Sequence, residues 1–60
     1  MYKLEYQSLG KGKWMQYAER IACKLHVLQL LDETNPDNTQ RISHMETGKV
    51  IYEGPGRGTW

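Results

Sequence analysis

Residues 18–33 read AERIACKLHVLQLLDE and contain neither glycine nor proline. Apolar side chains recur there at intervals of three and four residues, which is the spacing of one face of an α-helix. We expect this face to pack on the rest of the chain; it consists of Ala18, Ile21, Ala22, Leu25 and Leu28. The pattern predicts a helix over residues 18–33. It ends before Pro36, because proline disfavours the α conformation in the preceding residue.

Two hairpins are predicted to flank this helix. Residues 2–7 alternate apolar and polar side chains as a half-buried strand does, and glycines at 10 and 12 allow a turn before a second strand at residues 13–17. Residues 40–45 and 49–53 flank Glu46-Thr47-Gly48, a sequence typical of a hairpin turn with glycine in the left-handed region. The predicted fold is α+β, with ββαββ order and one helix across one face of a four-stranded antiparallel sheet.

The length of 60 residues allows one domain, which we place at residues 1–53. Residues 54–60 read GPGRGTW, and three glycines and a proline in seven residues predict a flexible tail rather than a regular element. A domain this small is marginally stable without a disulfide, a metal or a partner subunit.

Composition narrows the classes of partner and compartment. A single cysteine excludes an intrachain disulfide and fits a reducing cytoplasm. Residues 27–31 are the longest apolar run, far short of a membrane span, so no membrane partner is expected. Eight Lys and Arg against seven Asp and Glu leave a net charge of +1, which argues against binding nucleic acid chiefly by phosphate neutralisation.

A second apolar stripe is expected on the other side of the predicted helix, formed by Cys23, Val27, Leu30 and Leu31. One interpretation is that the loop after the helix or the tail, through Trp60, covers it. The other is that a partner covers it, either a host protein or a second copy of the chain in a symmetric homodimer. These five residues are the candidate protein-binding site.

Catalytic and metal chemistry find little support in the residue pattern. Cys23 and His26 are three residues apart on the predicted helix, but with His44 they make at most three of the four ligands that a structural zinc site takes. The carboxylates are dispersed without an acid–base spacing. We therefore predict that the protein is not an enzyme and uses no cofactor or metal.

Nucleic-acid binding is the alternative class of function. Tyr and Trp side chains alternate on the predicted strands near basic residues, and bases of single-stranded nucleic acid stack on such rings above a basic groove. The candidate residues for this function are Lys11, Lys13, Trp14, Arg41 and Lys49.

The layout also resembles a loose group of small uncharacterised ββαββ proteins from bacteriophages and bacterial genomes. The resemblance lies in a first strand with alternating aromatics, a glycine turn before a tryptophan, an alanine-containing helix and a Glu-Thr-Gly hairpin. The residues that carry it are Tyr2, Leu4, Tyr6, Gly12, Lys13, Trp14, Tyr17, Ala18, Ala22, Glu46, Thr47, Gly48, Val50 and Ile51. It implies the fold and a phage or mobile-element source, and it implies no activity.

These observations lead to a ranked set of functions. The first is a non-enzymatic protein-interaction module, expected in the cytoplasm of a bacterial host if it comes from a phage, that binds and inhibits a host protein. The second is a small nucleic-acid-binding protein, and the third is a structural subunit of a larger complex.

Overall fold

The elements of the chain follow the order ββαββ in the computed structural model, which describes residues 1–60. Strand β1 (Tyr2–Gln7) leads through a short 3₁₀ turn (Ser8–Gly10) and a loop to β2 (Met15–Ile21). Helix α1 (Lys24–Leu31) follows, and then β3 (Thr39–His44) and β4 (Val50–Pro55). The α+β class predicted from the sequence is confirmed.

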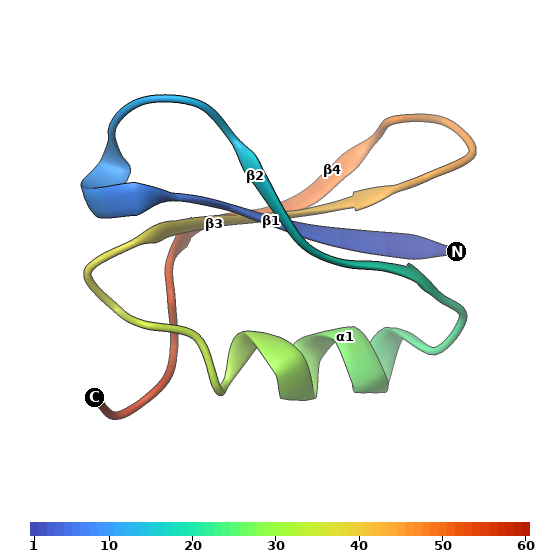
Figure 1. Cartoon of the computed structure of the whole chain (residues 1–60). Coiled ribbons are helices and arrows are strands. Elements are labelled where there is room, and N and C mark those ends of the chain that lie inside the picture. The colour runs from blue at the N-terminus through green and yellow to red at the C-terminus, as the bar shows by residue number, and fades with distance from the viewer.

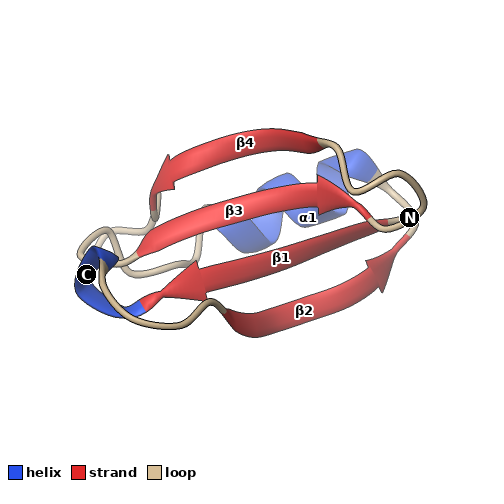
Figure 2. Cartoon of the chain, turned by 90° about the horizontal axis from the view of Figure 1, so that it is seen from above, coloured by secondary structure: helices blue, strands red, loops and turns tan.

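The four strands form one sheet in the order β2-β1-β3-β4, and all three neighbouring pairs are antiparallel. Helix α1 lies beneath one face of this sheet (Figure 1). Seen from the opposite side, the strands carry no element in front of them (Figure 2). We call this uncovered side the outer face, and the other the helix face. Strands β2 and β4 are the two edges.

The core lies between α1 and the two central strands. Leu4 of β1 and Ile42 of β3 are paired across the sheet and fully buried. Val27 and Leu31 of α1 are also fully buried and lie four residues apart, on the same side of the helix. Ile21 of β2 completes the buried cluster. This core is small, as expected for a chain that buries only about 60% of its unfolded surface.

The helix prediction was wrong at its start, because residues 18–21 belong to β2 and not to α1. The register explains the mistake. The pairing of β1 with β2 shifts irregularly along the strands. The paired residues are Tyr6 with Met15, Leu4 with Ala18, and Tyr2 with Ile21. An extra residue at each shift sets the inward side chains of β2 three apart instead of two. Three-residue spacing is also the signature of a helix face.

The predicted core face of the helix was wrong in the same way. Ile21 is buried, and Ala18 and Leu28 pack against the core, but Leu25 is 70% exposed and Ala22 is exposed. Because the helix begins at Lys24, its inward side is set by Val27 and Leu31 instead.

The expectation that residues 54–60 contain no regular element was wrong for the first two of them. Strand β4 continues to Pro55, since Gly54 pairs with Gln40 and Pro55 pairs with Thr39 of β3. The chain then turns down beside the end of α1, where the C-terminus lies (Figure 1). A regular element therefore includes two of the seven residues assigned to the tail.

The predicted turn of the second hairpin is confirmed. Gly48 has φ 76°, in the left-handed region, and its N–H donates to the carbonyl of His44 at 2.8 Å. Strands β2, β3 and β4 each begin or end within a few residues of the predicted bounds. No helix of the chain combines the length and the apolar character needed to cross a membrane.

Candidate functional site

A pocket of about 280 Å³ opens at the end of the sheet where β1 ends and β2 begins. Its lining comes from β1, β2, β3, the loop after α1 and the C-terminal residue: Tyr6, Tyr17, Thr34, Asn35, Asn38, Gln40 and Trp60. No charged side chain is among them. Three aromatic rings and four uncharged polar side chains therefore make up the whole lining.

The sheet places the inner residues of this pocket. Tyr6 of β1 and Gln40 of β3 are cross-strand partners on the helix face. Tyr17 is the extra residue in β2 where the pairing shifts between Gln16 and Ala18. Its ring meets that of Tyr6 edge to face, with centroids 6.4 Å apart. The irregularity in β2 thus supplies one wall of the pocket.

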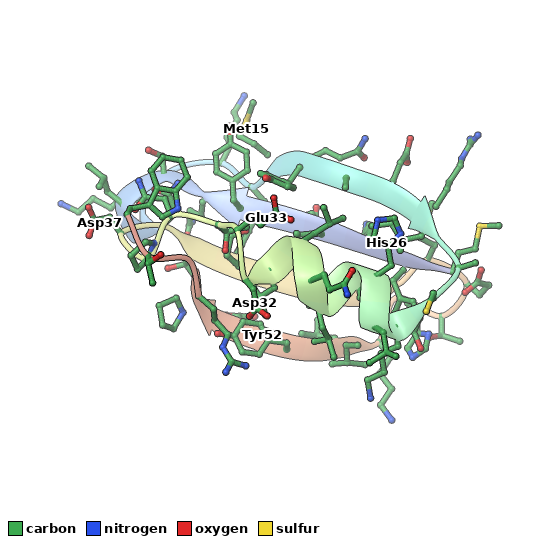
Figure 3. The ribbon with its side chains drawn as sticks, turned by 90° about the horizontal axis from the view of Figure 1, so that it is seen from below. Met15, His26, Asp32, Glu33, Asp37 and Tyr52 are labelled. Carbon is green, nitrogen blue, oxygen red and sulfur yellow. The ribbon has the colours of Figure 1, made fainter.

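The loop after α1 supplies the polar side. The Asp37 backbone N–H donates to Asn35 Oδ1 at 2.9 Å, and the Leu9 backbone N–H donates to Asn38 Oδ1 at 3.0 Å. These bonds hold the loop in shape and tie it to the turn after β1. Figure 3 shows Asp37 of this loop at the opposite end of the molecule from His26, which lies near the start of α1.

The last residues of the chain pack against the same loop. The backbone N–H groups of Gly56 and Gly58 donate to the carbonyls of Asn38 at 3.0 Å and Thr34 at 2.7 Å. Thr34 is buried and its hydroxyl donates to the Leu31 carbonyl at 2.6 Å. A Cβ at Gly56 would collide with the backbone carbonyl of Asn35, so only glycine fits there. This packing brings Trp60 to the pocket.

Gln40 is the unusual member of the lining. Its side chain is 99% buried, and its Oε1 is enclosed without a hydrogen-bond partner. Leaving a buried acceptor unpaired costs about 1–3 kcal/mol. Ser43 Oγ is the other enclosed atom without a partner, but it belongs to the outer face and lines no pocket. Native proteins rarely leave such a group unpaired without a reason.

Apolar side chains at the rim of the pocket remain accessible. Tyr17 is 47% exposed and Trp60 is 79% exposed. Met15 does not line the pocket, but it is the cross-strand partner of Tyr6 and is 50% exposed. It lies on β2, which borders the sheet (Figure 3). Of the predicted site residues, only Trp60 lines the pocket.

The predicted apolar stripe on the helix does not form a surface. Val27 and Leu31 are fully buried in the core and Leu30 packs against it, so these side chains are not available to a partner or a second copy. Cys23 is exposed at the N-cap of α1, where its carbonyl accepts the N–H of Val27 at 3.2 Å. The stripe was misplaced because the helix begins six residues later than predicted.

Part of the predicted nucleic-acid site does come together on the outer face. The Arg41 guanidinium lies 4.1 Å from the centroid of the Trp14 ring. Arg41 also donates to Glu5 Oε1 from Nε at 3.1 Å and from Nη2 at 3.0 Å, and both residues are partly buried. The charge of Arg41 is therefore neutralised, and Arg41 occupies one face of the indole ring.

The other predicted nucleic-acid residues do not join this pair. Lys11 and Lys13 lie in the β1–β2 loop, whereas Lys49 lies in the β3–β4 turn at the other end of the sheet (Figure 1). Tyr2, Tyr6 and Tyr52 are in register with the core positions on the helix face. Strand alternation thus separates the tyrosines from the basic side chains, and no stacking platform forms over a basic groove.

Other titratable side chains are dispersed. His44 stacks on Tyr2 with ring centroids 4.7 Å apart. No group of three or more His, Cys, Asp and Glu side chains lies close enough to hold a metal ion. The N-terminal amine donates to both carboxylate oxygens of Glu46 at 2.8 Å, and this hydrogen bonding lowers the pKa of Glu46.

Sequence reasoning missed six of the seven residues that line the pocket as members of a site. The segment from Asn35 to Asn38 was interpreted only as the signal that ends the helix. Asn35, whose side chain accepts the backbone N–H two residues on, was the available signal for an ordered loop. Comparison of the chain with protein-family models, curated proteins and solved structures found no match.

Proposed function

We propose that this chain is a non-enzymatic protein-interaction module that binds its partner at the pocket between β1, β2 and the loop after α1. The observation that carries the proposal is the Gln40 amide, which is buried at the pocket with its Oε1 unpaired. Because Oε1 is enclosed, a partner would bond the amino end of this amide, and that bond would offset part of the cost of burying the side chain.

The composition of the rim supports a protein partner. Residues that dominate the binding energy of protein interfaces are enriched in Trp and Tyr and lie in pockets that become desolvated. Tyr17 and Trp60 meet this description, and Met15, two residues before Tyr17 on β2, is a further exposed apolar side chain of a flexible type. The absence of charge in the lining favours a protein contact over a phosphate backbone.

The proposal has three further parts. The protein comes from a phage or mobile element, it acts in the cytoplasm of a bacterium, and it inhibits a host protein. They rest on the resemblance of the layout and on the single cysteine.

The test begins with a photo-crosslinking amino acid at position 17 and, separately, at position 53 on β4. We expect a specific crosslinked protein only from position 17. That protein is then purified and its Kd measured for the wild type, for Tyr17→Ala with Trp60→Ala, and for Leu25→Ala with Val50→Ala. The last pair removes exposed apolar side chains that do not line the pocket.

We expect the pocket variant to weaken binding by at least about tenfold, since anchor residues typically contribute 2 kcal/mol or more. The control variant should bind as the wild type does. Equal losses in both variants would place the interface elsewhere. A steep loss of affinity with salt would instead indicate nucleic acid in the complex.

A further inference from the structure

The amides and the indole that line the pocket offer it mainly hydrogen-bond donors. The Oδ1 atoms of Asn35 and Asn38 accept hydrogen bonds from the backbone N–H groups of Asp37 and Leu9, respectively. Gln40 Oε1 is enclosed and inaccessible. The amino groups of these three amides have no acceptor within the protein, whereas each asparagine Oδ1 has already used one of its two lone pairs. Trp60 adds an indole N–H, which is a donor only.

Such a pocket matches a ligand that has acceptors and few donors. An ordinary peptide strand presents N–H and C=O groups alternately, and for its N–H groups the lining offers only the tyrosine hydroxyls and amide oxygens that already accept one hydrogen bond. Proline has no N–H, and its carbonyl still accepts hydrogen bonds. The uncharged lining also disfavours ionised ligands, because it offers no opposite charge.

The aromatic side chains fit the same ligand. Proline-rich segments in the polyproline II conformation bind grooves lined by aromatic rings, against which the proline rings pack. Here the edge-to-face pair of Tyr6 and Tyr17 and the exposed ring of Trp60 line one pocket. Its volume of about 280 Å³ is near the lower end for ligand pockets and suits a short segment. A segment already extended loses little conformational entropy on binding.

We propose that the occupant of this pocket is a proline-rich segment of the partner protein in the polyproline II conformation. This inference rests on the proposed function. The proline rings contact Tyr6, Tyr17 and Trp60, and the peptide carbonyls accept hydrogen bonds from the amino groups of Asn35, Asn38 and Gln40.

The probe is an uncharged octaproline peptide with blocked ends, titrated into the ¹⁵N-labelled full chain. A blocked Ala-Ser octapeptide and the neutral oligosaccharide chitotriose serve as comparison ligands. We expect octaproline to shift the side-chain amide signals of Asn35, Asn38 and Gln40 and the indole N–H of Trp60, with Kd between about 10 µM and 1 mM. The other two ligands should leave these signals in place.

The discriminating variant is Asn35→Asp with Asn38→Asp. Each aspartate keeps the oxygen that accepts the loop hydrogen bond and loses the amino group. Gln16→Glu with Gln29→Glu adds the same charge at exposed positions outside the pocket. We expect octaproline affinity to fall at least about tenfold in the first variant and to stay unchanged in the second. Gln40→Met, which adds no charge, should also weaken binding.

Two results would overturn the inference. One is octaproline affinity that survives removal of both amino groups, and the other is chitotriose shifting these amides while octaproline does not. If octaproline fails to bind while the crosslink from position 17 still identifies a partner, the inference fails and the proposed function stands. If neither is observed, both fail.

Discussion

Leu25 and Leu31 are side chains of one type on one helix, and the structure assigns them opposite energetic roles. Leu31 is fully buried and Leu25 is 70% exposed. Truncation of a buried leucine removes its transfer free energy and leaves a cavity, and together these cost about 2–5 kcal/mol. Truncation of an exposed leucine usually changes stability by less than about 0.5 kcal/mol.

We therefore expect Leu31→Ala to unfold this small domain or to lower its urea midpoint sharply, while Leu25→Ala leaves the midpoint near that of the wild type. Circular dichroism during urea denaturation measures both. If Leu25→Ala lowered the urea midpoint more than Leu31→Ala did, the helix would pack through the face predicted from the sequence.

Glu46 gives a pH-dependent contribution at the same scale. The hydrogen bonds from the N-terminal amine hold the pKa of Glu46 below its usual value of 4.5. A carboxylate with a lowered folded pKa stabilises the fold above its unfolded pKa and loses this effect as pH falls through the folded value.

Glu46→Gln should accordingly reduce stability at pH 6 and make no difference at pH 2, with the two urea midpoints converging between these limits. High salt should shrink the difference at pH 6, because this pair is exposed to solvent. A constant gap across the whole pH range would show that the effect of the substitution is not electrostatic.

Strand β2 is the element that could not be predicted from local sequence patterns. Alternation in Tyr2–Gln7 and the Glu-Thr-Gly turn depend on neighbouring residues, and both were predictable. The three-residue spacing of Met15, Ala18 and Ile21 depends on irregular pairing with β1, and no local pattern distinguishes it from a helix. Pairing across the sheet decided the structure of this segment.

Substitutions of Arg20, which lies at one of the two irregular positions of β2, test this pairing directly. It has φ 58°, in the left-handed region, where a non-glycine residue is strained by about 1–3 kcal/mol. We expect Arg20→Gly to match or exceed the wild type in stability and Arg20→Val to fall below it by about 1 kcal/mol or more, as judged by urea denaturation. Equal stability of all three would mean that residue 20 does not hold this conformation.

At the scale of the whole molecule, the pocket is assembled from segments that are far apart in sequence. Its residues come from four separate stretches of the chain and meet only once the sheet, the loop and the C-terminal residues pack together: Tyr6, Tyr17, Asn38 with Gln40, and Trp60. The sequence identified the fold class and one residue of this site. The remaining residues could not be grouped without knowing the strand order β2-β1-β3-β4.

Gln40 is the residue of this pocket that we expect to lower the stability of the fold and to strengthen binding, because binding residues are often kept at a cost in stability. Its Oε1 is buried without a hydrogen-bond partner, while its amino group faces the ligand in the proposed complex. Gln40→Met replaces the amide with an apolar side chain of similar length, and it removes an unpaired group whose burial costs about 1–3 kcal/mol.

The most direct measurement is the free energy of unfolding of Gln40→Met, taken by urea denaturation beside its Kd for the partner crosslinked at position 17. We predict that the variant unfolds at a higher urea concentration than the wild type and binds the partner more weakly. A variant that is less stable would show that the Gln40 amide is satisfied within the fold, and one that binds the partner as tightly as the wild type would show that the amide takes no part in binding.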